Sequence, residues 1–354
     1  MKIMFYINAI HHGGAERVMV NLAEMFANRG NDVSLVTSFM DIWEYTLSGR
    51  VTRINLCERT YKGFIKRNYK LTKLLRKKLK EEKPDILISF MAEPNFRALI
   101  ATIGLKTKNL ISVRNDPNRE YPNKLFKFLA RNLYKRADGV VFQTSDAKAW
   151  FPKKIQEKSE IIMNQVDDKF YHVQRSENPK NIITTGRLTE QKNHEMLIRA
   201  YSQIADKVED DLIIYGEGEL REKLESLVKE LNLEGRVHLP GATKDVPKVL
   251  SEAKIFVLSS DYEGMPNSLL EAMAVGVPCI STDCPCGGPR GIIKDGINGF
   301  LCNVNDVNNL ACKIETILNL KNAENTIGKS AKEHLMTFAP QIVEKRWISY
   351  VEQL

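Results

Sequence analysis

The sequence lacks any apolar run long enough to cross a bilayer as a helix. Its first ten residues also lack the long apolar core and the small-residue cleavage site of a signal peptide, so they predict a buried first strand and a cytoplasmic protein. The six cysteines form no Cys-x-x-Cys pair, and Cys284 and Cys286 have neither a nearby histidine nor a second pair to complete a metal site. In a reducing compartment, these cysteines are expected to be ordinary small core residues.

Two signatures of nucleotide and metal binding are absent as well. Gly13 and Gly14 follow the first predicted strand, but they do not form the Gly-x-Gly-x-x-Gly motif of dinucleotide-binding oxidoreductases. No Asp-x-Asp motif occurs, and we expect neither a metal ion nor another cofactor. The paired glycines could still let the backbone approach a ligand closely at a helix N-terminus, with a plain tight turn as the alternative.

The sequence does contain enough apolar residues, 43% of 354, to bury a large core, and its length suggests two domains. Positive charge is concentrated in the first of them. Residues 1–165 hold 30 Lys and Arg against 16 Asp and Glu, whereas the remaining residues hold 22 against 28. Such a basic half attracts phosphate-rich surfaces, namely nucleic acid or an anionic membrane.

Strand-like and helix-like patterns alternate along both halves, which predicts an α/β fold of two doubly wound parallel sheets facing each other across a ligand cleft. The predicted domains are 1–165 and 173–330, and the helical tail 331–354 is expected to pack back on the first domain. Predicted strands cover residues 2–7, 32–37, 85–90, 109–113, 139–143 and 161–164, then 182–185, 212–215, 237–239, 255–258, 279–281 and 299–301.

The stretch 259–283 predicts a strand end, a glycine loop and a helix, and the rest of the chain is interpreted around it. Asn267 or Ser268 can cap the helix. A helix that begins beside a glycine loop offers free N–H groups and the positive end of its dipole, which suits phosphate. Glu263 in the loop and Glu271 in the helix add two acids at fixed positions relative to that phosphate site.

Three further turns follow predicted strands and could serve the same ligand. The first, 185–192, carries Arg187 and Lys192, two cations suited to a diphosphate. The second, 215–218, and the third, 286–290, are rich in glycine, which allows close approach of backbone to ligand. Each turn alone could be a plain turn or a surface ion, but all are expected at the carboxyl ends of strands, where doubly wound sheets bind ligands.

Two segments of the first half combine cations with apolar residues. In 61–83, lysines and arginines accompany an apolar side formed by Ile65, Tyr69, Leu71, Leu75 and Leu79, which predicts a basic amphipathic helix. In 121–136, a similar mixture includes Phe126 and Phe128. Docking on an anionic membrane is one interpretation. The other is a solvated surface helix whose apolar stripe faces the core.

An ordered set of short motifs resembles a known family. The motifs GGAERV, GRLTEQKN, GEGEL, RVHLPG, EGMPNSLLE and GGPRGIIKDGINGFL, in this order, resemble the retaining glycosyltransferases of family 4, of the bacterial surface-polysaccharide type, which have the GT-B fold. The resemblance extends over essentially the whole chain. It implies transfer of a hexose or N-acetylhexosamine from a UDP-sugar to a glycan acceptor carried on polyprenyl diphosphate, without a metal ion.

The resemblance also implies roles for individual residues. Arg187 and Lys192 would stabilise the donor diphosphate, Glu263 would face the transferred sugar, and Glu271 would hold the ribose hydroxyls. The other donor-binding residues that it implies are Gly13, Gly14, Gly186, Gly216, Gly218, His238, Gly264, Met265, Pro266, Asn267, Ser268 and Leu269. Retention in this family is attributed to attack on the same face of the sugar, with the donor phosphate helping to take the acceptor proton.

The sequence departs from the family in one segment. Many relatives have a histidine near the transferred sugar, but the corresponding segment 113–117 contains none. Asp116 is the catalytic candidate in this segment, and Arg114 and Asn115 are candidates for the acceptor side.

We therefore expect a transferase that binds a nucleotide-sugar donor and a lipid-linked glycan acceptor, associates peripherally with the anionic inner face of the cell membrane, and takes part in capsule, O-antigen or related polysaccharide synthesis. A sugar-nucleotide epimerase or a phosphorylase on the same fold is the first alternative, and a basic nucleic-acid-binding module is the second. For the second alternative, the sequence lacks a nucleic-acid-binding motif with interleaved aromatic residues, and the acidic second half has no explanation. We therefore expect no nucleic-acid partner.

Overall fold

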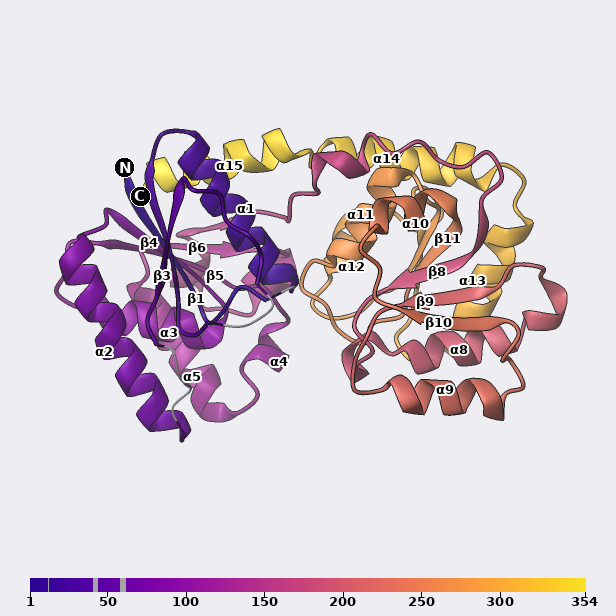
Figure 1. Cartoon of the computed structure of the whole chain (residues 1–354), viewed down its shortest axis with the longest axis horizontal. Helices are drawn as coiled ribbons and strands as arrows, with labels where there is room; N and C mark the ends of the chain where they lie inside the picture. Colours follow the sequence, from indigo (N-terminus) through magenta and orange to yellow (C-terminus); the bar gives the residue numbers. More distant parts are fainter. Residues whose placement is uncertain (12, 41–43, 58–61) are drawn as a thin grey trace. The chain divides into compact units, whose positions relative to one another are not determined.

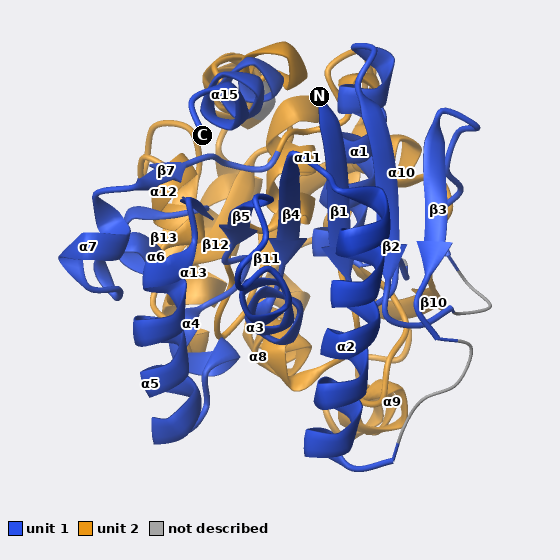
Figure 2. Ribbon diagram, turned by 90° about the vertical axis from the view of Figure 1, so that its left-hand side faces the viewer, with its two compact units in different colours: residues 1–164, 343–354 blue, residues 165–342 orange. Residues whose placement is uncertain are grey.

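The computed structural model describes residues 1–11, 13–40, 44–57 and 62–354, so His12 and the start of the basic segment at Tyr61 lie outside the described residues. The chain divides into two compact units (Figure 2). Unit 1 comprises Met1–Asn164 and Val343–Leu354, and unit 2 comprises Gln165–Ile342.

Unit 1 is built on a seven-stranded parallel sheet in the order β3-β2-β1-β4-β5-β6-β7. The helix α1 and the end of α15 cover one face of this sheet, and α2, α3 and α5 cover the other (Figure 1). The strands are β1 (Lys2–Ile7), β2 (Asp32–Thr37), β3 (Val51–Asn55), β4 (Ile86–Phe90), β5 (Lys108–Ser112), β6 (Gly139–Phe142) and β7 (Ser159–Ile161). The helices are α1 (Gly14–Asn28), α2 (Phe64–Glu82), α3 (Ala92–Ala101), α4 (Pro117–Glu120), α5 (Lys124–Leu133), α6 (Ser145–Ala149), α7 (Lys153–Gln156) and α15 (Pro340–Glu352).

Unit 2 has a six-stranded parallel sheet in the order β10-β9-β8-β11-β12-β13. The helices α8, α9 and α13 cover one face, and α10, α11 and α14 cover the other (Figure 1). The strands are β8 (Lys180–Thr185), β9 (Leu212–Tyr215), β10 (Val237–Gly241), β11 (Ala253–Leu258), β12 (Cys279–Thr282) and β13 (Phe300–Cys302). The helices are α8 (His194–Ser202), α9 (Arg221–Glu230), α10 (Val246–Glu252), α11 (Asn267–Val275), α12 (Gly288–Ile292), α13 (Val307–Asn319) and α14 (Lys329–Met336).

Short helical turns complete the connections. They are the 3-10 turns η1 (Tyr134–Arg136), η2 (Asp168–Phe170), η3 (Glu190–Lys192) and η4 (Ala205–Lys207), and a π-helical turn η5 (Glu324–Gly328). No described helix has the length and apolar character that a membrane span requires.

The predicted α/β fold of two doubly wound parallel sheets is confirmed, and its cause is visible in the central strands. In β1, Ile3 through Ile7 are buried on both faces because helices lie above and below the sheet.

The edge strand β3 was not predicted. Its sequence, VTRIN, is short and polar, and only Val51 is fully buried, so it carries neither a continuous apolar run nor a clear alternation.

The predicted tail 331–354 divides between the units, which corrects the expectation that all of it packs on the first domain. The helix α14 belongs to unit 2 and packs against α11. The end of α15 belongs to unit 1, where Trp347 is 1% exposed and lies 6.0 Å from the ring of Phe90. The hydroxyl of Tyr350 accepts a hydrogen bond from the backbone N–H of Val140 at 3.0 Å and donates to the Lys158 carbonyl at 2.6 Å.

This packing predicts that Trp347→Ala lowers the free energy of unfolding of unit 1 by about 3–5 kcal/mol, because the substitution leaves a cavity beside β4. Chemical denaturation would measure the change, monitored by far-UV circular dichroism because that signal reports the backbone and not the deleted tryptophan. The matched control is Ile342→Ala on the same helix, where the side chain is 45% exposed and a change below about 0.5 kcal/mol is expected. Equal losses in the two variants would contradict the assignment of the helix end to the core of unit 1.

Candidate active site

The strand order of unit 2 reverses between β8 and β11. The chain runs from β8 outward to β9 and β10, then returns to place β11 on the other side of β8. Loops at such a reversal leave the carboxyl edge of the sheet in opposite directions, and ligands of doubly wound sheets bind there. The loops that follow β8 and β11 are 186–193 and 259–266, and they contain the predicted residues Arg187, Lys192 and Glu263.

A buried ion pair joins these two loops. Lys192 Nζ lies 2.6 Å from Glu263 Oε1, and the two side chains are only 15% and 9% exposed. The hydroxyl of Ser260 donates to the same carboxylate oxygen at 2.8 Å. Buried charges are tolerated when they are paired and hydrogen-bonded, so each of these two residues compensates the other.

Further hydrogen bonds fix the two loops relative to each other. The backbone N–H of Asp261 donates to the Gln191 carbonyl at 2.9 Å, and the Ser259 hydroxyl donates to the Lys192 carbonyl at 2.9 Å. The Asn193 amide donates to the Asp261 carboxylate at 2.7 Å. These hydrogen bonds fix the positions of the two loops, so the loops hold Lys192 and Glu263 close together.

Glycines bring the loops after β8 and β9 into backbone contact. A Cβ on Gly216, whose φ is +155°, would lie 1.8 Å from the Gly186 carbonyl oxygen, so no other residue fits there. A Cβ on Gly218 would lie 2.4 Å from the Leu188 carbonyl oxygen. The Arg187 side chain between these contacts is exposed and makes no hydrogen bond or ion pair with any described residue, so its charge is available to a ligand.

The helix α11 begins directly after the loop that carries Glu263. Its N-cap is Pro266, so the predicted capping by Asn267 or Ser268 is wrong, and no side chain caps the first turn. The Ser268 hydroxyl oxygen is buried and has no hydrogen-bond partner in the described part of the chain. Glu271, one turn along, is 5% exposed. A helix start without a side-chain cap leaves backbone N–H groups for an anion.

Other predicted donor-binding residues surround this helix start. Gly264 approaches the start of α12, because a Cβ on Gly288 would lie 1.9 Å from the Gly264 carbonyl oxygen. Met265 and Leu269 are buried at 6% and 0% exposure, so their side chains support the loop and the helix. What they can offer a ligand is therefore chiefly their backbone.

His238 lies away from this edge of the sheet. It is paired in register with Ile213 near the amino end of β9, and its Nε2 lies 3.0 Å from the Asp211 carboxylate. At the carboxyl end of the same strand, β10, lies Gly241, whose carbonyl accepts from the Gly216 N–H at 2.9 Å. The structure thus favours Gly241 over His238 as a neighbour of the ligand.

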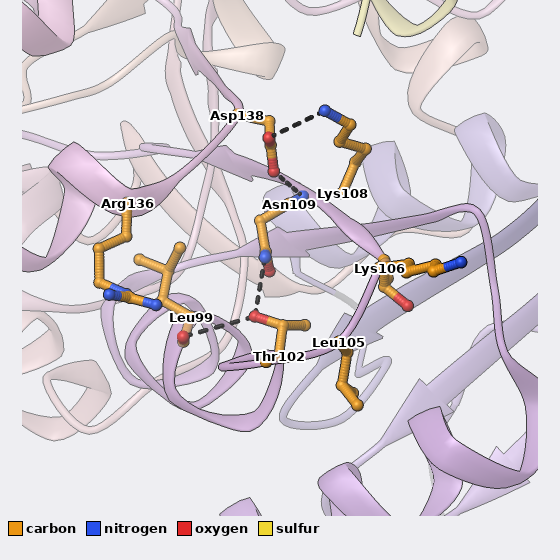
Figure 3. A pocket seen from close by; sticks show the side chains of 10 residues that line it. Leu99, Thr102, Leu105, Lys106, Lys108, Asn109, Arg136 and Asp138 are labelled. Carbon is orange, nitrogen blue, oxygen red and sulfur yellow. Dashed lines mark hydrogen bonds and ion pairs between the residues drawn. The ribbon is translucent and has the colours of Figure 1, made fainter.

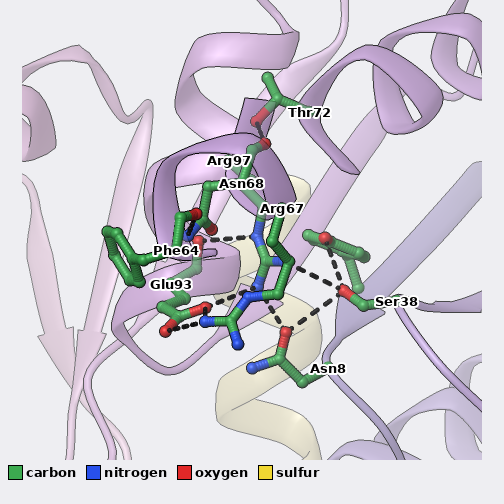
Figure 4. Close-up of polar contacts among 9 residues, drawn as sticks. Asn8, Ser38, Phe64, Arg67, Asn68, Thr72, Glu93 and Arg97 are labelled. Atoms are coloured by element: carbon green, nitrogen blue, oxygen red, sulfur yellow. Dashed lines mark hydrogen bonds and ion pairs between the residues drawn. The ribbon is translucent and has the colours of Figure 1, made fainter. Parts of the chain in front are cut away.

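Unit 1 has its own reversal of strand order, between β1 and β4, and a buried arginine occupies it (Figure 4). Arg97 of α3 is 1% exposed and donates to Asn8 Oδ1, which follows β1, and to the Ser38 hydroxyl at 3.3 Å, which follows β2. Its Nε donates to the Glu93 carbonyl at 3.1 Å, and the Glu93 carboxylate pairs with Arg67 of α2 at 3.0 Å. No motif of the sequence predicts this network.

The predicted glycine turn of unit 1 follows Asn8. Gly13 is the N-cap of α1 and Gly14 is its first residue, and no side chain caps this helix start. A Cβ on Gly13 would lie 2.2 Å from a carboxylate oxygen of Glu16, so a larger residue here would displace the Glu16 side chain.

The segment after β5 contains the predicted acceptor-side residues. Arg114 is 8% exposed, its Nη2 donates to Asn164 Oδ1, and its guanidinium lies 4.6 Å above the Phe90 ring. Its Nε and Nη1 have no partner among the described residues, and burial lowers its pKa to about 9. Asn115 accepts from the Asp116 N–H at 2.9 Å. Asp116 accepts from the Asn118 N–H at 3.0 Å and caps α4, so its catalytic role stays a prediction beside this structural one.

Sequence reasoning missed one titratable residue in the unit 2 site. His194 begins α8, two residues after Lys192, and is 3% exposed against the backbone of Gly186 and Arg187. Neither ring nitrogen has a hydrogen-bond partner of good geometry among the described residues. Burial, reinforced by the charge of Lys192, lowers the His194 pKa to about 4. In the sequence, the only indication of this residue is a histidine close to Lys192 in the segment after β8.

No group of three or more His, Cys, Asp or Glu side chains in the described part of the chain is arranged to hold a metal ion. The predicted charged residues of the unit 2 site are Arg187, Lys192, Glu263 and Glu271, of which Lys192 and Glu263 pair with each other.

Comparison with known families matches both halves of the chain. The family model described as Glycosyltransferase Family 4 matches residues 12–170, and the one described as Glycosyl transferases group 1 matches residues 166–334. The chain belongs to the family 4 glycosyltransferases. It is therefore an enzyme of the hexosyltransferase class, and the predicted family is confirmed.

Individual relatives agree with the family assignment. The chain is 28% identical, over 100% of its length and 99% of the relative, to the Campylobacter jejuni GalNAc-alpha-(1->4)-GalNAc-alpha-(1->3)-diNAcBac-PP-undecaprenol alpha-1,4-N-acetyl-D-galactosaminyltransferase. It is 34% identical to an uncharacterized glycosyltransferase of Methanocaldococcus jannaschii, over 66% of this chain and 63% of that one. The structure of Anabaena HepE with UDP and glucose aligns over 100% of both chains with a TM-score of 0.85 at 19% identity, which confirms the GT-B fold.

The low pKa of His194 predicts how stability depends on pH. Because the folded pKa is about 4 and the ordinary value is 6.5, the unfolded chain takes up the proton first as the pH falls. The contribution of neutral His194 to stability is fully present above pH 6.5 and is lost progressively as the pH falls toward 4. The loss is at most about 3 kcal/mol.

We expect His194→Leu to remove this part of the pH dependence, measured as the difference in unfolding free energy between pH 7 and pH 4.5. His172→Leu is the control, since the His172 side chain is 76% exposed, and it should keep the wild-type difference. A His194→Leu variant with the same pH dependence as the wild-type protein would show that the buried imidazole does not control it.

Proposed function

We propose that this family 4 enzyme is a retaining transferase that moves a hexose or N-acetylhexosamine from a UDP-sugar to a glycan on polyprenyl diphosphate, in the synthesis of a bacterial surface polysaccharide. The observation that carries the proposal is the buried Lys192–Glu263 ion pair at the strand reversal of unit 2. The name of the Campylobacter relative, which acts on an undecaprenol-diphosphate glycan, supports the lipid-linked acceptor. The UDP and glucose bound to Anabaena HepE support the donor.

The donor diphosphate fits the charges of this site. Arg187 is exposed and unpaired among the described residues, the Lys192 side chain is 15% exposed, and the start of α11 presents backbone N–H groups without a side-chain cap. Together they provide two cations and a helix dipole for two phosphates, which is the arrangement that stabilises negative charge in a partly dry site. Glu271, one turn into α11, would accept hydrogen bonds from the ribose hydroxyls.

The transfer step uses the same charges. As the bond between the sugar C1 and the diphosphate oxygen breaks, positive charge develops on the sugar and negative charge on the leaving UDP. Lys192 and Arg187 would stabilise the leaving diphosphate, and Glu263 would face the sugar. The acceptor hydroxyl oxygen then bonds to C1 on the face that the UDP leaves, and its proton passes to a diphosphate oxygen. The two cations would perform the charge stabilisation that a metal ion performs elsewhere, so we propose a metal-independent reaction.

The transfer assay is release of UDP from a panel of UDP-sugars with a lipid-linked glycan acceptor and excess EDTA. We expect Lys192→Met to lower kcat at least about 100-fold, because it removes charge stabilisation of the leaving group and leaves Glu263 buried without a partner. Glu271→Gln should mainly raise KM for the donor. The control is Lys180→Met, an exposed lysine at the opposite, amino end of β8, which should keep wild-type kinetics.

Two outcomes would contradict this function. Full turnover in Lys192→Met would remove the ion pair from the mechanism. Interconversion of sugar nucleotides without any acceptor, or release of sugar 1-phosphate on addition of inorganic phosphate, would identify an epimerase or a phosphorylase on the same fold.

For the acceptor, we propose that unit 1 docks on an anionic membrane through a surface that we call the α2–α5 surface. Its apolar members, from the starts of α2 and α5, are Phe64, Ile65, Tyr69, Leu125 and Phe128, all 49% to 83% exposed. The two helix starts are neighbours, since the rings of Phe64 and Phe126 lie 5.7 Å apart. Lys66, Lys73, Lys124 and Arg131 add exposed positive charge to the same helices.

The structure corrects the predicted apolar stripe of α2, and the correction strengthens this proposal. Only Leu71, Leu75 and Leu79 face the core, whereas Ile65 and Tyr69 point outward beyond the packed part of the helix. Figure 2 shows α3 between α2 and α5, so the two helices lie on either side of one neighbour on the same face of the sheet. Exposed aromatic and branched residues ringed by lysine are typical of proteins that insert into a lipid headgroup layer.

We expect Ile65→Ser with Phe128→Ser to lower binding to vesicles that contain anionic phosphatidylglycerol by at least about tenfold, because each substitution removes about 1.5–3 kcal/mol of apolar burial in the lipid layer. Flotation of the full chain measures bound protein, and raised salt should weaken wild-type binding further. The matched control is Ile297→Ser, whose side chain is 61% exposed in unit 2 and should not contribute. Wild-type protein that does not float with anionic vesicles would overturn the docking proposal.

A further inference from the structure

Glu16, in the first turn of α1, has no role in the function proposed above. It belongs to the motif GGAERV, in which Gly13 and Gly14 are the residues with a predicted role. The Glu16 side chain is half-buried, and its carboxylate forms no hydrogen bond or ion pair with any described residue. An ionised carboxylate can accept several hydrogen bonds, so this one is available to a ligand that carries O–H or N–H donors.

The glycine at position 13 leaves room for this carboxylate. A Cβ on Gly13 would lie 2.2 Å from one carboxylate oxygen of Glu16 and 2.8 Å from its carboxyl carbon. The backbone itself does not require glycine there, because Gly13 has a φ of −105° and a ψ of 165°, an extended conformation that any residue adopts. What the absent side chain provides is therefore the space that the Glu16 carboxylate occupies.

Arg114, which follows β5, attracts the same carboxylate. It is 8% exposed, and its Nε and Nη1 have no partner among the described residues. Burial lowers the pKa of Arg114 to about 9, and the negative charges of Glu120 and Glu16 oppose this lowering. Glu16 therefore lies within electrostatic reach of the guanidinium, and the attraction between opposite charges draws its carboxylate toward the carboxyl edge of the unit 1 sheet.

Met91 lies between these two charged residues in the order of the strands. It directly follows β4, which pairs with β1 on one side and with β5 on the other. Its φ of +73° and ψ of 158° are strained for a residue other than glycine, and strained residues of this kind concentrate at sites that bind ligands. The Met91 side chain is nevertheless 37% exposed, so the strained position presents an apolar group to solvent.

An acid and an exposed apolar side chain on neighbouring strand ends suit a sugar. The hydroxyls of a sugar donate hydrogen bonds to a carboxylate, and its C–H groups pack against an apolar side chain. A phosphate suits this place less well, because Glu16 repels it. The geometry therefore favours the glycan part of the acceptor over its diphosphate.

The cavity at the opposite, amino edge of the same sheet has no comparable arrangement. It measures about 250 Å³ and lies at the starts of β5 and β6 (Figure 3). Figure 3 shows the side chains of Lys106 and Arg136 on opposite sides of it. The acid in its wall, Asp138, lies 3.5 Å from Lys108 Nζ and accepts from the Asn109 N–H at 2.8 Å. Asp138 is therefore not available to a sugar in the way that Glu16 is.

We propose that Glu16 and Met91 bind the acceptor sugar. The Glu16 carboxylate accepts a hydrogen bond from a hydroxyl of that sugar, and the Met91 side chain packs against its C–H groups. Arg114 and Gly13 act as positioning residues, because Arg114 attracts the carboxylate and Gly13 leaves space for it. The inference rests on the transferase function proposed above and names the part of unit 1 that contacts the acceptor.

Kinetics at saturating UDP-sugar test the Glu16 contact, with release of UDP as the signal. The acceptors are undecaprenyl-diphosphate glycans that end in glucose, galactose, N-acetylglucosamine or N-acetylgalactosamine. We expect Glu16→Gln to raise KM for the acceptor at least about tenfold and to leave KM for the donor within about twofold, because a hydrogen bond to a charged group is the stronger one. The matched control is Glu157→Gln, an exposed acid before β7 at the amino edge, which should keep both values.

The substitution Gly13→Ala tests the position of the carboxylate, since it displaces the group without removing it. We expect it to raise KM for the acceptor at least about fivefold in the wild-type protein but less than about twofold in the Glu16→Gln variant, because the two changes affect one contact. Equal effects in the two backgrounds would overturn the placement of Glu16 at the acceptor.

The substitution Met91→Gly separates contact with the acceptor from a structural role. Glycine adopts a φ of +73° without strain, so the variant should keep the Tm of the wild-type protein or raise it. We expect its KM for the acceptor to rise at least about threefold, because apolar contact with the sugar is lost. A variant with a changed Tm and the wild-type KM for the acceptor would remove Met91 from the site.

The outcomes distinguish this inference from the function on which it rests. An unchanged KM for the acceptor in Glu16→Gln, with an active wild-type enzyme, would overturn the Glu16 contact and leave the transferase function intact. A wild-type protein that releases no UDP with any of these acceptors would contradict the transferase function, and the acceptor site would be overturned with it.

Discussion

The buried ion pair between Lys192 and Glu263 is the interaction on which the rest of the site depends. Two charges that are 15% and 9% exposed persist in a folded protein only if each stays close to the other. The loops after β8 and β11 must therefore keep one geometry, which a backbone hydrogen bond and the Ser259 hydroxyl maintain. This geometry fixes Lys192, the cation that we assign to the leaving diphosphate. The same contact is therefore needed for a stable fold and for sugar transfer.

Each unit has a cation at the reversal of its strand order, but different groups stabilise the two cations. Each has a doubly wound sheet with one reversal of strand order, and each places a buried cation there. In unit 2 the cation is paired with an acid that we expect to face the sugar. In unit 1, Arg97 is held by the neutral oxygens of Asn8 and Ser38, with Glu93 beside it. A buried arginine satisfied in this way fixes the ends of β1 and β2.

Much of this organisation could be predicted from the sequence, because the central strands are continuous apolar runs between turns, and β1, β2 and β9 have the predicted bounds. The catalytic candidates were found as charged or glycine-rich residues at strand ends. What could not be predicted depends on contacts distant in sequence. Lys192 and Glu263 are 71 residues apart, so nothing local indicates that they pair. The burial of His194 and the outward direction of Tyr69 likewise depend on which neighbours pack around them, and periodicity alone does not specify those neighbours.

The most direct test of the central claim is a crystal structure of the protein with UDP. The account predicts diphosphate oxygens within about 3 Å of Lys192 Nζ and of backbone N–H groups at the start of α11, with the ribose against Glu271. A UDP molecule bound elsewhere, with the ion pair between Lys192 and Glu263 unchanged and no contact to α11, would contradict it.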